Sequence, residues 1–284
     1  MNNGTSAASS EWEIVKFETN QISDARAHFR SEGFVVFREA FALDLADEFW
    51  SALEAGIAKG LPLTFSHHGN LYTNPEVPER VRGLPRIIDV EDHIPLSREL
   101  MLCPTVRRFL TEVYDAAPAC MQTLTYKYSS EQGAHSDSTL VSPPCAFNYD
   151  RETLAAAWFA LEKSDQTNGA LVIYPGSHRV PKRGFTDGFS SYGAYTKYLE
   201  ELCASHGCPR TVFIANPGDL LFWASDFVHA GGAIEGEGDE LPTRRSLVCH
   251  YARLPQWQAS LDVRYVREPF ADASFFRKAE MLAV

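Results

Sequence analysis

Apolar positions in the N-terminal part of the chain repeat every three or four residues, which is the pattern of helices that bury one face. The strongest stripe predicts a helix over residues 44–59. A second helix is expected over residues 23–32, with Ser23 as its N-cap and Gly33 as the residue that ends it. Pro104 suits the first turn of a third helix, where no backbone N–H is needed. We expect these helices to cover the outside of a sheet.

The later part of the chain carries short apolar runs separated by turn residues, which is typical of strands. Dipeptides that favour turns, such as Asn168-Gly169 and Pro217-Gly218, stand between the runs. Many short strands joined in this way indicate a sandwich or a jelly roll. The expected strands are residues 34–37, 121–128, 155–161, 170–174, 211–214, 219–223 and 244–252.

A histidine and an aspartate stand two positions apart in this β-rich region, as His135 and Asp137. Residues two apart in an extended strand project from the same face, so both side chains can bind one ion. A third candidate ligand, His229, follows the apolar run 218–223. Two imidazoles and one carboxylate are the ligand set of a mononuclear non-haem iron(II) site with open positions for oxygen and a co-substrate. The spacing alone also fits a hydrogen-bonded surface pair, and zinc could take the same three ligands.

Two further segments accompany these ligands. They are Asn168-Gly169-Ala170-Leu171-Val172-Ile173-Tyr174-Pro175-Gly176-Ser177-His178 and Thr243-Arg244-Arg245-Ser246-Leu247-Val248-Cys249-His250-Tyr251. In this order the motifs resemble the phytanoyl-CoA dioxygenase family of iron(II)- and 2-oxoglutarate-dependent oxygenases, over about residues 34–251. The resemblance implies a mainly β protein with flanking helices around a double-stranded β-helix core, that is, a cupin-like jelly roll.

The whole chain, residues 1–284, is expected to form a single oxygenase domain, because its length fits one large domain. The jelly-roll core would span about residues 120–252, and the small, polar residues 1–11 would be flexible. The segment 185–206 breaks the strand rhythm with aromatic residues among glycines and serines. Such an insertion can be a lid over the substrate, although aromatic residues three apart more often pack in a core.

By the resemblance, the two histidines and the aspartate hold iron(II), and 2-oxoglutarate and O2 bind as co-substrates. The far carboxylate of 2-oxoglutarate then needs a cation, and Arg244 suits it because a guanidinium can donate two parallel hydrogen bonds to a carboxylate. Ser246 shares a strand face with Arg244, whereas Arg245 falls on the other face. An acidic, glycine-rich run at residues 235–240 lengthens the gap after His229 relative to the family, which leaves the choice between the two arginines open.

Further residues near the site are expected from the same comparison. Arg86, Gln122 and Leu124 would lie near 2-oxoglutarate. For His178 we favour a structural turn over a fourth metal ligand. His67 and His68 stand in a polar loop, where solvation is favoured over substrate contact. The expected substrate contacts are His67, Asn70, Tyr72, Phe147, Phe189 and Tyr192.

The amino-acid composition restricts the classes of molecule that the protein is expected to bind. The chain carries 26 Lys and Arg against 37 Asp and Glu, a formal net charge of −11, which argues against nonspecific binding to nucleic acid or to an anionic membrane surface. We expect a small-molecule substrate, no membrane span and no signal peptide, and either a monomer or a homodimer. The six cysteines follow no disulfide or metal-binding pattern, so a reducing, cytoplasmic setting is expected.

The expected activity is hydroxylation of a small metabolite with release of succinate and CO2. Halogenating relatives replace the carboxylate ligand by a small residue, so the presence of Asp137 favours oxygen transfer. Desaturation, epoxidation or rearrangement of a natural product would use the same ligands and stays open. The alternatives from other classes are a jelly-roll binding protein without turnover and a zinc-dependent hydrolase, although neither G-x-S-x-G nor H-E-x-x-H occurs.

Overall fold

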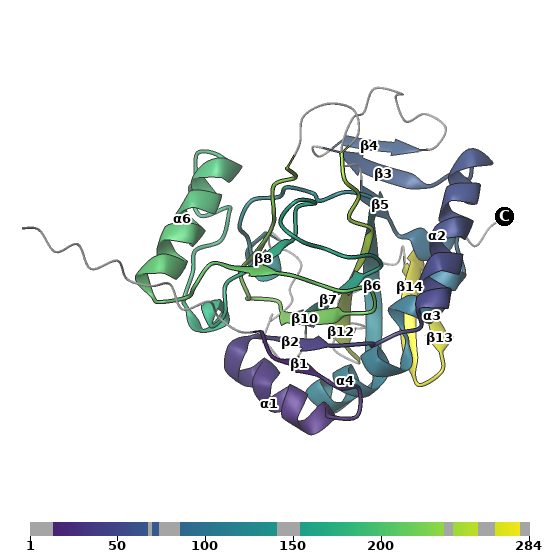
Figure 1. Ribbon diagram of the computed structural model, residues 1–284, viewed down its shortest axis with the longest axis horizontal. Coiled ribbons are helices and arrows are strands. Elements are labelled where there is room, and N and C mark those ends of the chain that lie inside the picture. The colour runs from purple at the N-terminus through teal and green to yellow at the C-terminus, as the bar shows by residue number, and fades with distance from the viewer. Residues whose placement is uncertain are drawn as a thin grey trace, which may run out of the picture.

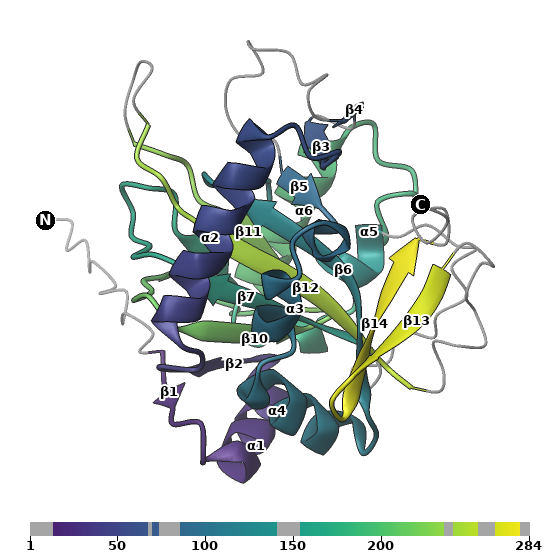
Figure 2. The same ribbon diagram turned by 90° about the vertical axis from the view of Figure 1, so that its right-hand side faces the viewer.

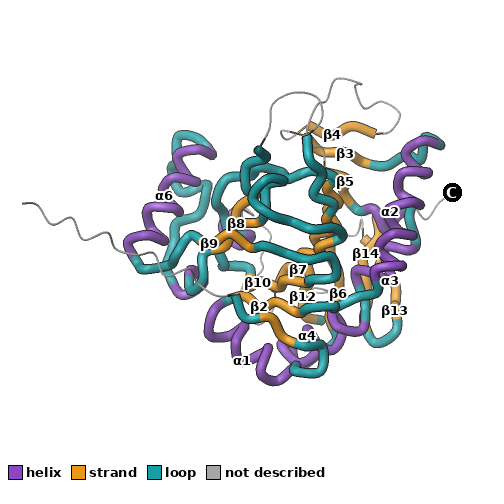
Figure 3. The backbone as a smooth tube through the Cα atoms, in the orientation of Figure 1, coloured by secondary structure: helices purple, strands orange, loops and turns teal. Residues whose placement is uncertain are grey.

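The computed structural model describes residues 14–67, 70–73, 86–140, 154–235, 241–254 and 265–278. Within these ranges the strands form one large sheet of eleven strands and one small sheet of three (Figure 1). The helices lie at the periphery and the strands are stacked in the middle of the molecule (Figure 3). The prediction of a β-rich core with flanking helices is therefore confirmed.

The large sheet runs in the order β1-β2-β10-β7-β12-β6-β5-β3-β4, and β14 pairs with both β6 and β13. The small sheet has the order β11-β8-β9. The strands of the large sheet are β1 (Lys16–Phe17), β2 (Phe34–Phe37), β3 (Thr64–His67), β4 (Asn70–Thr73), β5 (Arg86–Ile88), β6 (Pro118–Tyr126), β7 (Leu154–Ala160), β10 (Leu220–Ala224), β12 (Ser246–Arg253), β13 (Tyr265–Phe270) and β14 (Ala273–Lys278). Those of the small sheet are β8 (Leu171–Ile173), β9 (Thr211–Phe213) and β11 (His229–Gly231).

Helices cover the outer face of the large sheet, where α2 and α3 lie in front of the strands in Figure 2. No helix among the described residues is long and apolar enough to cross a membrane. The helices are α1 (Ile22–Glu32), α2 (Leu43–Ala58), α3 (Leu96–Met101), α4 (Pro104–Tyr114), α5 (Asp137–Leu140) and α6 (Tyr192–Ser205), with short 3-10 turns η1 (Val90–Asp92) and η2 (Ser177–Arg179).

Alternation along the strands separates two apolar cores. On β2, Val35 and Phe37 pack with the helices on the outer face, whereas Phe34 and Val36 point into the space between the two sheets. Trp158 of β7 lies in that same inner core together with side chains of the small sheet. Because successive side chains of a strand point to opposite faces, the large sheet has an apolar layer on each side. The inner layer is the one that can surround a site.

The insertion at residues 185–206 packs against the outer face of the small sheet. Its helix α6 lies beyond β8 as seen from the large sheet (Figure 1). Tyr195 and Leu199 of α6 share a buried cluster with Val172 of β8. Ser191 caps the helix by accepting a hydrogen bond from the backbone N–H of Ala194 at 3.1 Å. Core packing therefore accounts for most of the aromatic residues of this segment.

The cysteine pair Cys203 and Cys208 has a structural explanation at the end of α6. The N–H of Cys208 donates to the carbonyl of Cys203 at 2.9 Å, and the N–H of Gly207 donates to the carbonyl of Ala204 at 3.2 Å. With Gly207 at φ +70°, this is the Schellman motif, in which the residues at these two positions make an apolar contact. All five cysteines in the described ranges are free, and Cys145 lies outside them.

The predicted elements agree with the structure except at some of their ends. Helix α1 begins at Ile22 and no side chain caps it, so the assignment of Ser23 as the N-cap is wrong. Gly33 ends this helix at φ 82°, as expected. Strand β12 begins at Ser246, so Arg244 precedes the strand instead of lying within it. Serine also occurs inside the first turn of helices, so the residue type at position 23 could not fix where α1 begins.

Candidate metal centre

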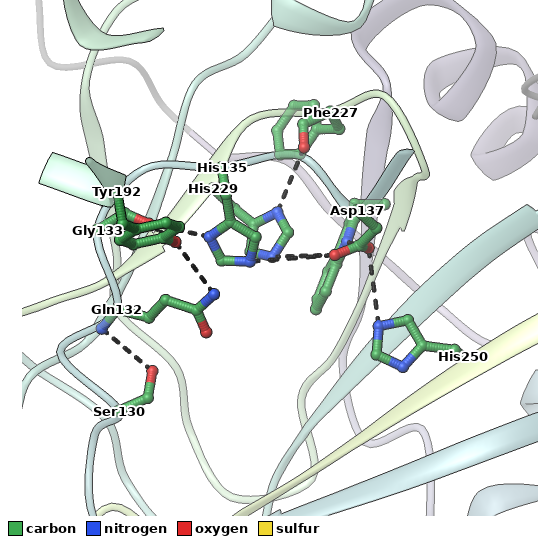
Figure 4. A network of polar contacts seen from close by, with 10 residues as sticks. Ser130, Gln132, Gly133, His135, Asp137, Tyr192, Phe227, His229 and His250 are labelled. Atoms are coloured by element: carbon green, nitrogen blue, oxygen red, sulfur yellow. Dashed lines mark hydrogen bonds and ion pairs between the residues drawn. The ribbon is translucent and has the colours of Figure 1, made fainter. Parts of the chain in front are cut away.

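The side chains of the two histidines and the aspartate converge in the structure (Figure 4). His135 and His229 form a single antiparallel bridge, in which the N–H of each donates to the carbonyl of the other at 3.0 and 2.9 Å. Their ring centroids are 4.3 Å apart. Asp137 Oδ1 lies 4.0 Å from His135 Nε2 and 3.8 Å from His229 Nε2. One ion can contact all three side chains, because their ligand atoms lie within 4.8 Å of one another.

Asp137 reaches the site from a helical turn. It is the first residue of α5, while His135 contributes only its single bridge, so the two are not successive inward positions of one strand. The N–H of Ser138 donates to the carbonyl of Ser225 at 2.9 Å, which fixes the start of α5 against the loop before β11. The predicted proximity of the pair is confirmed, but the strand explanation for it is wrong.

Backbone carbonyls set the tautomer of both histidines. His135 Nδ1 lies 2.9 Å from the carbonyl oxygen of Gly133, and His229 Nδ1 lies 3.3 Å from that of Phe227. A carbonyl oxygen only accepts, so each Nδ1 carries the proton and donates, and each Nε2 keeps its lone pair for a metal. Burial lowers the pKa of His135 to about 3 and also lowers the pKa of His229. Both imidazole rings are therefore neutral at neutral pH and can offer the Nε2 lone pair to a metal.

The two oxygens of Asp137 have different surroundings. Oδ2 accepts a hydrogen bond from Trp223 Nε1 at 2.8 Å and lies 3.8 Å from His250 Nε2, whereas Oδ1 faces the two candidate histidine ligands. Burial alone would raise the pKa of Asp137, but the imidazoles of His229, His250 and His135 together outweigh it and hold the pKa below its ordinary value. The carboxylate is ionised and presents one oxygen to the site.

Trp223 and His250 are the two residues of this centre that sequence reasoning did not identify. Alternation along the strand that starts at Ser246 puts His250 on its inner face, but does not place it against Asp137. The signal for Trp223 is weaker still. An inward-facing indole N–H in a buried strand needs an acceptor, and nothing local to the sequence says which one it finds.

Arg244 is a buried cation with no ionic partner in the described part of the chain. Its side chain is 2% exposed, Nη1 donates to the carbonyl of Gly169 at 2.7 Å, and the guanidinium lies 5.7 Å from the ring centroid of Trp158. Its Nε has no hydrogen-bond partner, and neither has the buried hydroxyl of Ser246. Burial lowers the pKa of Arg244 to about 10. Charged groups are seldom buried unless paired, so the surroundings of Arg244 suit an anion.

Arg245 faces the outside of the large sheet. Its N–H donates to Glu162 Oε1 at 2.5 Å, its Nε lies 3.8 Å from Glu162 Oε2, and its guanidinium lies 5.2 Å from the ring centroid of Trp50. The alternation expected from the sequence therefore holds for this pair, although the strand starts only at Ser246. Of the two arginines, Arg244 is the one that points between the sheets.

Gln122, Leu124 and Arg86 also face the inner side. Gln122 is paired with His250 and Leu124 with Val248 across β6 and β12, and paired residues share a face. Ile88 of β5 is paired with Leu124, and Arg86 stands two positions before Ile88 on that strand. The structure thus brings these three candidates to the same face as Ser246.

The β3–β4 hairpin turns its predicted contacts away from the site. His67 is paired with Asn70, and Tyr72 with Phe65, whose side chain packs in the outer core under the helices. Tyr72 packs against that same core. These three residues therefore lie on the opposite face from Arg86, and the structure does not bring them to the metal centre. The pattern alone could not decide this, because both faces of the hairpin carry polar and apolar residues.

Of the two residues of the insertion that were predicted to contact substrate, one lies beside the candidate metal ligands and the other does not. Phe189 packs with Tyr195 and Tyr198, at centroid separations of 5.3 and 5.0 Å, as part of the apolar cluster of the insertion. Tyr192 does reach the centre, where its hydroxyl donates to the carbonyl of Gly133 at 3.2 Å. Phe147 and His68 lie outside the described residues.

His178 belongs to a tight turn, as expected. It lies in η2, is 2% exposed, and its Nε2 is 3.4 Å from the carbonyl oxygen of Arg30. Its ring fills the space where a side chain at Gly33 would stand. It has no place among the candidate metal ligands.

Comparison with known proteins finds one family. The model described as phytanoyl-CoA dioxygenase (PhyH) matches residues 29–240. A peroxisomal phytanoyl-CoA dioxygenase of Rattus norvegicus is 26% identical over 113 residues, and a probable phytanoyl-CoA dioxygenase of Caenorhabditis elegans is 32% identical over 107 residues. These matches cover 40% and 35% of this chain but only 30% of each relative's own length.

Solved structures share the fold at low sequence identity. The non-haem α-ketoglutarate-dependent carbocyclase SnoK from nogalamycin biosynthesis aligns with a TM-score of 0.62 at 16% identity, over 84% of this chain and 87% of its own. The epimerase SnoN, in complex with Fe3+, α-ketoglutarate and nogalamycin RO, aligns with a TM-score of 0.59 at 16% identity, over 90% and 98%. The likeness confirms the predicted cupin-like double-stranded β-helix. Because these two neighbours perform different reactions, the fold does not choose among reaction outcomes.

Proposed function

Since the chain belongs to the phytanoyl-CoA dioxygenase family, we propose that it is an iron(II)- and 2-oxoglutarate-dependent oxygenase that hydroxylates a small molecule and releases succinate and CO2. One observation carries the proposal. Two neutral imidazoles and one carboxylate lie at Trp223, and a buried arginine without an ionic partner among the described residues lies at Trp158. Both tryptophans belong to the inner core between the two sheets. A metal site alone would not require that arginine.

The candidate ligands suit iron(II). Neutral imidazole nitrogen and carboxylate oxygen are donors that this ion accepts, and three protein ligands leave coordination positions for other groups. His135 and His229 would bind through Nε2 and Asp137 through Oδ1. When bound, the iron supplies the oxidising chemistry together with O2 and 2-oxoglutarate.

The protein's own part is positioning. Trp223 and His250 hold Oδ2 of Asp137, which directs Oδ1 toward the histidines. Arg244, with Ser246 beside it, would bind the far carboxylate of 2-oxoglutarate through donors that otherwise have no partner. Gln122, Leu124 and Arg86 are further candidates to line the co-substrate. The apolar side chains of the inner core would keep water away from the reacting groups.

Hydroxylation is preferred because Asp137 is present where halogenating relatives leave a coordination position free. Desaturation, epoxidation or rearrangement would use the same residues, and product analysis distinguishes them. We do not carry over the acyl-CoA substrate in the relatives' name, since the matches cover only 30% of their length and a chain of net charge −11 favours no polyphosphate ligand. Free cysteines and the need to keep iron reduced support a cytoplasmic setting.

Anaerobic titration tests the proposal directly. Addition of iron(II) and 2-oxoglutarate to the metal-free protein should produce a weak visible charge-transfer band, and admission of O2 with substrate should release succinate. His135→Ala, Asp137→Ala and His229→Ala should each abolish the band while the fold remains. A wild-type protein that hydrolyses substrate with zinc, or that binds a ligand without oxygen-dependent succinate release, would disprove the oxygenase.

A further inference from the structure

Helix α6 makes direct contact with the segment that carries a candidate metal ligand. The hydroxyl of Tyr192, the first residue of the helix, donates to the carbonyl oxygen of Gly133 at 3.2 Å. The same carbonyl accepts from His135 Nδ1 at 2.9 Å. Gln132 Nε2 in turn donates to the Tyr192 hydroxyl at 3.1 Å. Figure 4 shows these groups in a row that leads from the tyrosine to the imidazole.

Steric fit gives an independent reason to connect α6 with this segment. A Cβ atom at Gly133 would lie 2.5 Å from Oγ1 and 2.8 Å from Cγ2 of Thr196, which stands one helical turn after Tyr192 on the same side of α6. Position 133 therefore has to be glycine for the helix to approach so closely. Glycine leaves the backbone freer to rotate than any other residue, so contacts must hold its carbonyl in place.

The Tyr192 hydroxyl is well placed to do this, because a packed element holds its ring. The ring lies 5.9 Å from that of Phe185 and 6.1 Å from that of Tyr195, between centroids. Tyr195 is fully buried in the cluster that joins α6 to the small sheet. The position of the hydroxyl is thus set by the core of the insertion and not by the ligand segment itself.

From these contacts we propose that Tyr192 is a positioning residue for the metal. Its hydroxyl fixes the carbonyl of Gly133, and through it the orientation and the Nδ1–H tautomer of His135. The inserted helix is then part of the metal-binding machinery as well as a cover on the small sheet. The inference rests on the proposed function for the role of His135 as a ligand, and it assigns to Tyr192 a task other than substrate contact.

The test is the affinity of the purified protein for Co(II), followed by its visible d–d absorption. Tyr192→Phe removes only the hydroxyl, and we expect Co(II) to bind about tenfold more weakly, at the low end of the effect of losing an outer partner of a ligand, because the Gly133 carbonyl itself remains. Tyr198→Phe is the matched control. Tyr198 stands on the same helix, but its hydroxyl accepts from the N–H of Arg183 at 3.1 Å and not from the segment that carries His135. The Co(II) affinity of this variant should equal that of the wild type. Equal affinities for the two variants would overturn the proposal.

A compensating pair checks the steric step. Gly133→Ala should weaken Co(II) binding, and Thr196→Ala in the same chain should restore part of it by removing the two closest atoms. Thr196→Ala is a mild change, because Oγ1 of Thr196 has no hydrogen-bond partner in the part of the chain that the structure describes. Wild-type affinity in Gly133→Ala alone would contradict the close approach. A wild-type protein that binds Co(II) but releases no succinate would refute the proposed function and leave this inference standing.

Discussion

Replacing Arg244 by Met should remove tight binding of 2-oxoglutarate and leave the metal-free fold about as stable as before. The guanidinium is 2% exposed, and its polar contact within the described residues is the hydrogen bond from Nη1 to the carbonyl of Gly169. Methionine has a similar length and no charge, so it can fill the same space next to Trp158. Ligand binding and stability are therefore expected to separate in this variant.

The expected change in stability is the difference of two terms. Burial lowers the pKa of Arg244 from 12.5 to about 10, so at ~1.4 kcal/mol per pH unit it disfavours the charged form by about 3 kcal/mol. Methionine removes that cost but leaves the Gly169 carbonyl unpaired, which costs about 1–3 kcal/mol. The terms largely offset, and we expect the free energy of unfolding of the metal-free protein to change by less than about 2 kcal/mol. Loss of one member of a buried charge pair costs ~2–5 kcal/mol of binding, so 2-oxoglutarate should bind at least about 30-fold more weakly.

The assays are urea unfolding of the metal-free protein and anaerobic titration of the iron-loaded protein with 2-oxoglutarate. Arg245→Met is the matched control, since Arg245 pairs with Glu162 on the outside of the sheet, and it should bind 2-oxoglutarate as the wild type does. If Arg244→Met bound the co-substrate normally but unfolded more than about 3 kcal/mol more easily, the arginine would be a structural residue. If Arg245→Met were the weak binder, the assignment of faces at the start of β12 would be wrong.

Three further changes test other parts of the structure. Burial, followed by the charge of Asp89, raises the pKa of Glu91 to about 8. The folded protein therefore keeps a proton that the unfolded chain loses above pH ~4.5. The free energy of unfolding should fall as pH rises between these two values. Glu91→Gln should remove this slope of up to ~1.4 kcal/mol per pH unit, and an unchanged slope in denaturation at pH 5.5 and 8 would refute it. His250→Leu should weaken Co(II) binding about tenfold, because it releases Oδ2 of Asp137. His250→Gln can still donate a hydrogen bond to Oδ2 and should keep most of the affinity. Equal losses of Co(II) affinity in the two variants would argue against the contact. Gly207→Ala, at φ +70° with open space around it, should cost about 1 kcal/mol of stability with no change in Co(II) affinity, and a larger loss would mean that the turn carries more than backbone strain.

The candidate ligands could be found from the sequence because their chemistry is fixed by residue type. Imidazole and carboxylate side chains are few, and the order of motifs around His135, Asp137 and His229 restricted them further. The preference for Arg244 over Arg245 followed from strand alternation, which persists two residues before the first residue of the strand itself. Single-domain organisation, oligomeric state and substrate stay predictions.

Contacts between distant segments could not be read in this way. That Trp223 and His250 both meet Oδ2 of Asp137 depends on how β10 and β12 approach α5, and no local pattern encodes that distance. The orientation of the β3–β4 hairpin could not be predicted for a related reason. Its two faces are similarly mixed, so only its pairing with β5 reveals that His67 faces the outer core.

The charges of the site connect its two halves. Asp137 is ionised, the two candidate histidine ligands are neutral, and Arg244 is a buried cation, so these four groups sum to zero charge. Iron(II) alone would leave two positive charges in this poorly solvated space, and 2-oxoglutarate alone would leave two negative ones. Both together restore neutrality, and opposite charges attract more strongly where water is excluded. Each should therefore strengthen the binding of the other by the same factor. An arginine buried without an ionic partner among the described residues is costly for the fold, and binding of the far carboxylate of 2-oxoglutarate would explain its presence.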